Sequence, residues 1–271
     1  MAEEKWVSRG ISAEREGLHY RHMVTEGMTL NALSLHTHAI YELIYFLGGD
    51  ATHVIEDRKY KLKRGDLVFV RPFHYHFIQI DGEAAYDRFD ILFDPERHGI
   101  DGVDGVPKEL EVIHIPEGST VDGILRRCDQ YYGQLGEDRF FSLLPHMLCE
   151  LLCNISLAPS EGSEESQPVS PLISAALKYM NDNLSTPISI GEIAERLFVS
   201  ESYLFRLFRQ ELHRTPKKYL TEKRLIMAQK KIREGGLPSR VCEECGFGDY
   251  TGFYRNYVQR FGHSPSEEKP Q

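Results

Sequence analysis

The sequence predicts two domains, an all-β barrel with two trailing helices and then an all-α domain. Three observations support this prediction. The chain has 271 residues, its hydrophobic pattern changes from strand-like to helical after about residue 119, and a polar segment at 158–171 separates the halves. With 41% hydrophobic and 27% charged residues the chain can bury a core. This composition excludes disordered and collagen-like chains.

Between about residues 30 and 94, short apolar segments rich in β-branched and aromatic residues alternate with Gly, Asp and Pro. We expect strands at 41–47, 67–70, 75–80 and 88–93. Short strands at such close intervals are typical of a sandwich or barrel.

Helical periodicity begins after the strands. Apolar residues recur at helical spacing from Val121 to Tyr132, and again from Phe140 to Leu152. These two amphipathic helices either cover the barrel or form a dimer interface, and the sequence leaves both roles open.

The segment 158–171 is rich in Pro, Gly, Ser and Glu and has no aromatic residue, which is typical of a linker. We therefore divide the chain into a domain at 1–157, a linker at 158–171 and a domain at 172–271. Residues 170–271 hold 16 Lys and Arg against 12 Asp and Glu, a net charge of +4, and the remainder carries −13. This asymmetry indicates a basic interaction module joined to an acidic domain.

The C-terminal part contains an internal repeat. Residues 204–216 align with residues 253–265 at a constant offset of 49, and Arg206 matches Arg255. A self-match at a fixed offset indicates one supersecondary unit used twice. Each unit has a short helix, a turn and a longer helix, the pattern of a helix-turn-helix whose second helix enters the major groove. The expected helices are 172–184, 190–197, 201–212, 216–234, 239–245 and 250–261.

The helix expected between the two units is long enough to act as a strut. Its 18 residues from 216 to 233 would span roughly 27 Å at ~1.5 Å per residue. Such a strut would place two recognition helices near one duplex repeat, ~34 Å, apart. The alternative is a pair of ordinary helical hairpins with solvated Arg and Gln. Basic residues on or near the strut that could contact phosphates are Lys217, Lys218, Lys223, Arg224, Lys230, Lys231 and Arg233.

These residues resemble the AraC/XylS family of bacterial transcription regulators. The motifs that carry the resemblance are Ile193-Ala194, 200–208, 216–219, 224–228, Gly246-Phe247, 253–255 and 261–265. The resemblance implies seven helices, DNA binding by both units and control of transcription. The outer faces of the two recognition helices supply the DNA-binding candidates Ser202, Phe205, Arg206, Arg209, Tyr250, Thr251, Tyr254 and Arg255.

This sequence departs from the family pattern in the first unit. Phe205 stands where a polar base-reading residue is common, and His213 replaces a turn glycine. In the second unit, Cys242 and Cys245 form a C-x-x-C pair without a second Cys/His pair to complete a zinc site. We expect these two thiols to be packed in a core.

The β-rich part carries a second constellation. His36, His38 and Glu42 precede Gly49 in the pattern H-x-H-x3-E-x6-G, and His76 follows Pro72. This pattern resembles the two motifs of cupins, whose fold is a double-stranded β-helix. Alternation along a strand would place positions 36, 38 and 42 on one face, as it would 74 and 76. The candidate ligand-binding residues are His36, His38, Glu42, Tyr45, Arg71, His74 and His76, and the candidate metal ligands among them are His36, His38, Glu42 and His76.

The two constellations together favour a ligand-responsive, sequence-specific DNA-binding regulator that is not an enzyme and has no catalytic residues. The alternative is a metal-dependent cupin enzyme, such as an isomerase or dioxygenase, with an accessory helical domain. We expect no required cofactor, although a divalent metal in the cupin pocket stays open. The expected partners are double-stranded DNA, a small polar effector for which a sugar is the commonest choice in the family, RNA polymerase if the protein is an activator, and a second copy in a homodimer.

The expected location is the cytoplasm, without a membrane partner. Five cysteines are an odd, sparse set, which is typical of reduced thiols. The acidic start of the chain lacks the apolar region of a secretory signal. The sequence identifies neither the effector nor the operator, and it does not distinguish activator from repressor.

Overall fold

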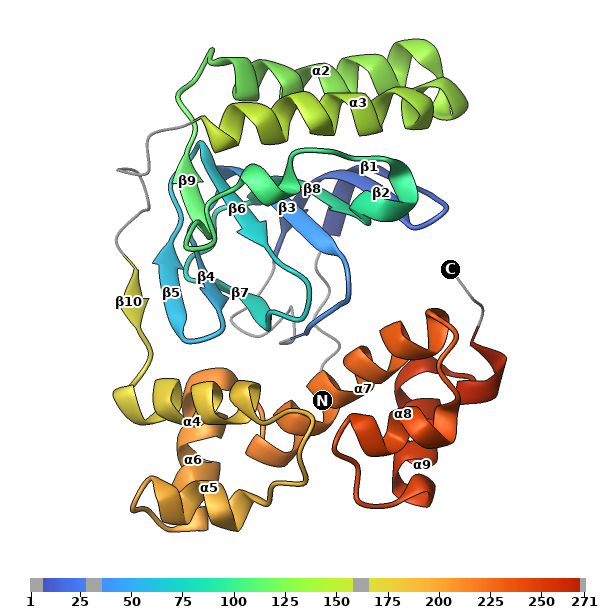
Figure 1. Ribbon diagram of the computed structural model, residues 1–271. Helices are drawn as coiled ribbons and strands as arrows, with labels where there is room; N and C mark the ends of the chain where they lie inside the picture. Colours follow the sequence, from blue (N-terminus) through green and yellow to red (C-terminus); the bar gives the residue numbers. More distant parts are fainter. Residues whose placement is uncertain (1–6, 28–35, 158–165, 269–271) are drawn as a thin grey trace.

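The computed structural model describes residues 7–27, 36–157 and 166–268. Figure 1 shows a central pair of β-sheets with two long helices on one side and a bundle of helices on the other. We call residues 7–157, together with the strand at 167–168, the β domain, and residues 171–268 the helical domain. Within the described residues, no helix combines the length and apolar character needed to cross a membrane.

The β domain is built from two antiparallel sheets. One has six strands in the order β1-β2-β8-β3-β6-β9, and the other has four in the order β10-β5-β4-β7. The strands are β1 (Val7–Arg15), β2 (Leu18–Glu26), β3 (Tyr41–Gly48), β4 (Ala51–Ile55), β5 (Arg58–Lys61), β6 (Asp66–Val70), β7 (His76–Ile80), β8 (Tyr86–Phe93), β9 (Val112–His114) and β10 (Gln167–Pro168). This arrangement confirms the predicted β-rich, cupin-like domain.

The four expected strands are confirmed as β3, β6, β7 and β8. The hairpin of β1 and β2 was not predicted, and neither were β4, β5 and β9. Strand β1 is exposed along most of its length, so its sequence lacks the apolar alternation that marks a half-buried strand.

Two long helices cover the six-stranded sheet. They are α2 (Thr120–Leu135) and α3 (Glu137–Ser156), and they follow the short α1 (Pro95–His98) and the 3-10 turn η1 (Val103–Gly105). Their apolar faces share one core with the sheet. Two tyrosines tie the layers together: Tyr20 donates to Asp129 at 2.6 Å and Tyr45 to Asp122 at 2.8 Å. The covering role is therefore confirmed, and the dimer interface stays a prediction.

The helical domain contains the six expected helices, each beginning and ending within two residues of its predicted bounds. They are α4 (Pro171–Asp182), α5 (Ile190–Arg196), α6 (Glu201–Leu212), α7 (Pro216–Arg233), α8 (Pro238–Glu244) and α9 (Tyr250–Phe261). A seventh helical segment in residues 166–268 is the 3-10 turn η3 (Pro265–Glu267).

Polar caps explain where these helices begin. Ser200, Thr215 and Asp249 each accept a hydrogen bond from the backbone N–H three residues later, at the starts of α6, α7 and α9. Ser189 forms a capping box with Glu192 at the start of α5. Three of the four helices in the two helix-turn-helix units thus begin at a local polar cap, and α8 is the exception.

The end of the predicted linker is part of the fold. Gln167 and Pro168 pair with β5, and the Val169 N–H donates to the Asp57 carbonyl at 2.8 Å. Residues 158–165 lie outside the described residues, so the linker interpretation of 158–171 stays a prediction there. The chain thus adds a strand to the β domain directly before α4 begins at Pro171.

Candidate nucleic-acid interface and effector cavity

The two helix-turn-helix units differ by one residue in their turns. The first turn joins α5, ending at Arg196, to α6, beginning at Glu201. The second joins α8, ending at Glu244, to α9, beginning at Tyr250. The extra residue explains why the repeat is offset by 49 residues in the second helices and by 48 at the starts of the first helices.

Each recognition helix buries one face. Leu204 and Phe208 of α6, and Phe253 and Tyr257 of α9, are fully buried at matching positions. Leu207, on the same side of α6, is half-buried. The opposite faces carry the predicted DNA-binding residues: Ser202, Arg206, Arg209, Tyr250, Thr251, Tyr254 and Arg255 are exposed, and Phe205 is half-buried. Their polar groups are therefore placed to meet a ligand on the surface.

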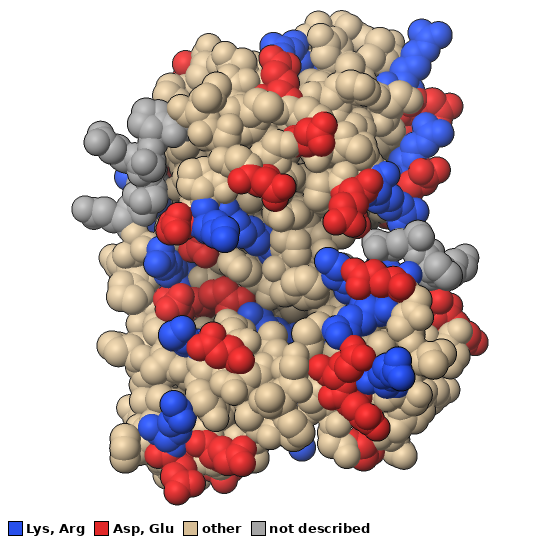
Figure 2. All heavy atoms as spheres, viewed as in Figure 1, with Lys and Arg blue, Asp and Glu red and all other residues tan. Residues whose placement is uncertain are grey.

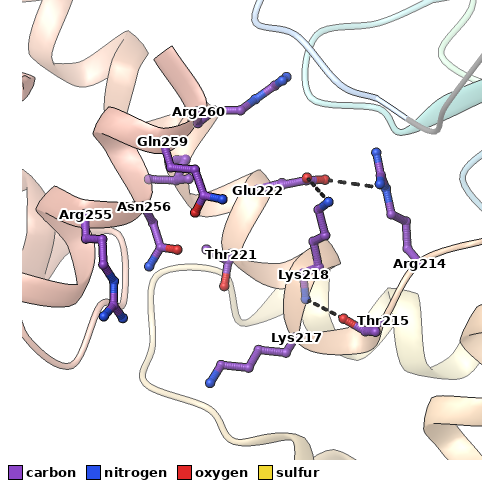
Figure 3. A pocket seen from close by; sticks show the side chains of 11 residues that line it. Arg214, Thr215, Lys217, Lys218, Thr221, Glu222, Arg255, Asn256, Gln259 and Arg260 are labelled. Atoms are coloured by element: carbon purple, nitrogen blue, oxygen red, sulfur yellow. Dashed lines mark hydrogen bonds and ion pairs between the residues drawn. The ribbon is translucent and has the colours of Figure 1, made fainter. Parts of the chain in front are cut away.

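A basic cleft lies between the start of α7 and α9. Its volume is about 610 Å³. Figure 3 shows the side chains that line it, which are Arg214, Thr215, Lys217, Lys218, Thr221, Glu222, Leu225, Arg255, Asn256, Gln259 and Arg260. Five of these residues are Lys or Arg and one is acidic. A cleft of this charge attracts phosphate, and it adjoins the recognition face through Arg255.

The cations of the cleft have different partners. Lys218 and Arg214 face Glu222 at 3.9 and 4.0 Å. Arg260 donates to the Thr37 carbonyl of the β domain at 3.4 Å. Lys217 and Arg255 are exposed and point away from Arg260 in Figure 3. Of the cations of the cleft, Lys217 and Arg255 are therefore the best candidates for phosphate contacts.

Helix α7 joins the two units. Leu220 packs in the core of the first unit and Leu225 in the core of the second. Two of the cations that we listed as phosphate candidates are buried. Arg224 donates to the carbonyls of Leu184 and Thr186 at 3.0 and 2.6 Å, and the Lys223 side chain is 4% exposed. The expectation for these two was wrong, because their side chains hold the domain together from inside.

The face of the molecule in Figure 2 does not repeat the charge of the cleft. Figure 2 shows Lys and Arg interspersed with Asp and Glu over the face that it presents. Mixed charge of this kind gives little attraction for a polyanion. The basic cleft is therefore the better candidate for phosphate contacts.

The β domain brings together the four predicted metal-ligand candidates. One ligand atom from each of His36, His38, Glu42 and His76 lies within 4.8 Å of the others. We call these four residues the His/Glu cluster. An isolated bridge joins His36 to His76 through two backbone hydrogen bonds of 3.1 and 3.0 Å. Backbone pairing therefore sets the position of the cluster.

Backbone carbonyls orient two of the imidazoles. His38 places Nδ1 2.8 Å from the Ile40 carbonyl, and His76 places Nδ1 3.2 Å from the His74 carbonyl. Their Nε2 atoms then lie 3.0 and 2.8 Å from Glu42 Oε2. Fixing Nδ1 in this way leaves Nε2 for a ligand, as in many metal sites, so the donor set fits a divalent cation.

The cluster is also an ion pair. Burial by itself would raise the pKa of Glu42, but the charge of His76 and hydrogen bonds from His38 and His76 outweigh burial and hold this pKa well below its usual value. Burial likewise opposes the charge on His76, and Glu42 nevertheless raises the pKa of that imidazole. The negative charge of Glu42 and the positive charge of His76 thus stabilise each other.

The cluster borders a cavity of about 130 Å³ whose remaining lining was missed by sequence reasoning. Its walls are Arg21, His36, Glu42, Ile44, His53, His76, Phe77, Ile78, Tyr86, Arg88 and Asp90. His53 is 1% exposed, and neither ring nitrogen has a hydrogen-bond partner. Burial lowers the pKa of His53 to about 3, so its ring is neutral. A neutral imidazole offers one donor and one acceptor to a bound molecule.

Three of the predicted ligand-binding residues lie elsewhere. Tyr45 bonds α2, as described above, and Arg71 donates to the carbonyls of Leu110 and Pro107 at 2.7 and 2.6 Å. His74 precedes β7 and is 3.9 Å from Glu111. Because the chain from 71 to 75 is not a strand, alternation does not carry His74 to the face of His76.

The C-x-x-C pair packs as expected. Cys242 and Cys245 are buried in the core of the second unit as free thiols. Burial raises the pKa of Cys245 to about 11, which makes the thiol inert at neutral pH.

The duplicated helix-turn-helix units and the β domain with its polar cavity define a class, the two-domain DNA-binding regulators. Comparison with family models gives a separate match for each of the two domains. Residues 24–101 match the family model described as the AraC-like ligand binding domain, and residues 193–270 match the helix-turn-helix domain model. The chain belongs to the AraC/XylS family of transcription regulators.

Proteins that match this chain over most of their own length are named as transcription regulators. The transcriptional activator RhaR of Cronobacter sakazakii is 26% identical over 90% of this chain and 89% of its own. An uncharacterised HTH-type regulator of Bacillus subtilis, YfiF, is 23% identical over 85% and 77%. A solved regulator from Chromobacterium violaceum with an AraC-type DNA-binding domain is 32% identical over 36% of this chain and 89% of that one, with a TM-score of 0.34.

Proposed function

We propose that the protein regulates transcription by reading two successive major-groove segments of one duplex with α6 and α9, under the control of a small molecule bound in the β domain. The observation that carries this proposal is the pair of matched, exposed recognition faces beside one basic cleft. Because the family consists of transcription regulators, the chain is not a cupin enzyme with an accessory helical domain.

The chemistry of the cavity favours a small polar, hydroxyl-rich effector, such as a sugar. Two ion pairs line the cavity, Arg21 with Asp90 and His76 with Glu42, each at 2.8 Å. Arg88, a third cation of the lining, donates to neutral oxygens at 3.2 Å. Hydroxyl groups of a ligand can bond the two unpartnered nitrogens of His53.

DNA binding itself requires no cofactor in this proposal. If a divalent metal binds, His36, His38, Glu42 and His76 would hold it, and it would supply a Lewis-acidic point for effector hydroxyls. Metal content of the purified protein, with and without a chelator, measures this directly. Loss of metal binding in Glu42→Gln, with DNA binding retained, is the expected result.

The remaining partners follow from the family. Several similar proteins are named transcriptional activators, and we propose that this protein also activates transcription by contacting RNA polymerase. We propose a homodimer formed through α2 and α3, which lie on the side of the sheets opposite the helical domain (Figure 1). The proposed compartment is the cytoplasm, in keeping with the free cysteines of the described chain.

A direct test measures the affinity for a selected operator and for random duplex over a range of salt concentrations. We expect the operator to bind at least ~10³-fold more tightly, with both affinities falling as salt rises. Equal affinity for all sequences would contradict the proposed function.

The effector is tested separately by thermal shift with a panel of sugars. His53→Phe should abolish stabilisation by the active sugar because the ring fills the cavity and removes both nitrogens. His114→Phe is the matched control, since His114 lies outside this cavity and is half exposed. Equal stabilisation of wild type and His53→Phe would contradict the proposed site.

A further inference from the structure

The β domain and the helical domain share a continuous core. Val54, Tyr75 and Phe77 of the β domain are buried in the same apolar cluster as Ile173 and Phe208 of the helical domain. Domains within one chain usually move against each other unless their interface is large and apolar. This core therefore indicates one fixed arrangement of the two domains.

Glu56 lies at the centre of the polar part of this interface. Its carboxylate accepts hydrogen bonds from Lys223 Nζ at 2.6 Å and from the Tyr219 hydroxyl at 2.6 Å, both on α7. It also accepts the Tyr75 N–H at 2.7 Å, so it joins the segment directly before β7 to α7. The side chains of Glu56 and Lys223 are 12% and 4% exposed. We call this set of contacts the Glu56 lock.

Neighbouring groups complete the lock. Lys223 Nζ also bonds Asn181 Oδ1 at 2.7 Å and lies 5.6 and 5.2 Å from the ring centroids of Tyr75 and Tyr219. Burial alone would raise the pKa of Glu56, but the charge of Lys223 overcomes it and lowers this pKa. Glu56 also adopts a left-handed backbone with φ of 48°, in the two-residue turn between β4 and β5, where hairpin geometry favours a positive φ.

A second contact reaches the other unit. Arg260 of α9 donates to the Thr37 carbonyl at 3.4 Å, whereas Tyr75 and Phe77 contact α7 and the end of α6. The β domain therefore touches both helix-turn-helix units, while their recognition faces stay exposed. Docking of the β domain on the helical domain therefore leaves the recognition faces accessible to DNA. It would also restrict the orientation of the two helix-turn-helix units relative to each other.

These contacts alternate with the His/Glu cluster along the chain. Thr37 lies between His36 and His38, and His76 lies between Tyr75 and Phe77. In the first segment the residue between the two cluster histidines meets the helical domain through its carbonyl, and in the second the residues on both sides of His76 meet it. A conformational change at the His/Glu cluster would therefore act directly on neighbouring residues of the chain that contact the helical domain.

We propose that the β domain braces the two helix-turn-helix units in one DNA-competent orientation, and that Glu56 is the positioning residue that locks this brace. The inference rests on the proposed function. In the unlocked protein the helical domain would sample other orientations, and apparent affinity for DNA falls with the fraction of molecules in the competent one.

The test compares Glu56→Gln with wild type in the full-length protein. Small-angle scattering reports docking without DNA, and we expect a larger radius of gyration for Glu56→Gln. We then measure affinity for an operator that contains both half-elements, one for α6 and one for α9. This affinity should fall about tenfold if a tenth of the molecules stay braced. Affinity for a duplex with one half-element scrambled should stay within about twofold, because one unit alone needs no brace.

Two further variants separate unlocking from unfolding. Lys59→Met removes a more exposed ion pair between the domains, a 3.9 Å contact to Glu211 whose lysine side chain is 35% exposed, and should leave both readouts unchanged. Glu56→Gln combined with Lys223→Met removes both buried charges and should recover part of the compactness. A circular dichroism spectrum like that of wild type confirms that each variant is folded.

The outcomes are distinct. A compact Glu56→Gln protein, or an expanded one with unchanged or tighter binding to the full site, would overturn the brace. If wild type binds no sequence selectively, the proposed function fails, while scattering still decides whether Glu56 locks the domains.

Discussion

The two helix-turn-helix units share a sequence pattern at an offset of 49 residues, but they pack in different surroundings. The core of the first unit also contains Tyr75 and Phe77 of the β domain. The core of the second is made of helical-domain residues around Phe253 and Tyr257. One supersecondary unit thus serves both as a docking surface and as a separately packed module.

The same contrast appears in the backbone. At the turn and at the end of the recognition helix, the second unit uses Gly246 and Gly262 with φ of 74° and 79°. The first unit places Phe198 and His213 there, with φ of 57° and 52°. Left-handed backbone is costly for residues other than glycine. His213 gains an edge-on contact with Phe77 at 5.7 Å, which a glycine could not make.

Truncation of the matched core residues should have the largest effect. Leu204 and Phe253 occupy equivalent positions and are both fully buried. Replacing either with Ala should lower the free energy of unfolding by about 2–5 kcal/mol, measured by urea denaturation. Amide hydrogen exchange should then show which elements each substitution destabilises. Leu204→Ala should reduce protection in β7 as well as in α6, whereas loss confined to α6 would show that the shared core does not couple the domains.

Removal of the matched arginines should have an intermediate effect on DNA affinity. Arg255→Ala should weaken operator binding by about 1–3 kcal/mol if the guanidinium reads a base. Arg206→Ala should cost a similar amount in the first unit. Fluorescence anisotropy at fixed salt measures both variants, and the exposed Arg240 of α8 provides a control substitution. Unchanged affinity in Arg255→Ala would remove it from the interface.

Exchange of the turn residues should change stability with opposite signs in the two units, and the substitution in the first unit should have the smallest effect. A Cβ at Gly246 would lie 2.7 Å from the Leu184 carbonyl oxygen, so Gly246→Ala should destabilise the protein by about 1–3 kcal/mol. Phe198 is 96% exposed, and Phe198→Gly should stabilise it by about 0.5–1 kcal/mol. Thermal unfolding reports both changes. Destabilisation by Phe198→Gly would mean that its ring makes a contact that matters.

The sequence was most informative where structure is encoded locally. Helical periodicity and the segments that interrupt it predicted every long helix of the helical domain, and local caps such as Ser200 and Asp249 fix where these helices begin. The His/Glu cluster was predicted because its spacing follows a known motif, although His36 reaches it through a single bridge and not through a strand.

Contacts that depend on tertiary placement were missed. His53 enters the cavity from β4, far in sequence from the motif, and a single histidine in a strand carries no signal of its own. Glu56 and Lys223 are 167 residues apart and read as surface charges. Their partnership arises only when β4, β7 and α7 meet.

Selection of bound sequences from random DNA tests the central claim most directly. For wild type, the account predicts two conserved elements about 10 base pairs apart, one for each recognition helix. Arg206→Ala and Arg255→Ala should each relax a different element. Enrichment of one element alone, or loss of the same element in both variants, would contradict the claim that α6 and α9 read one duplex together.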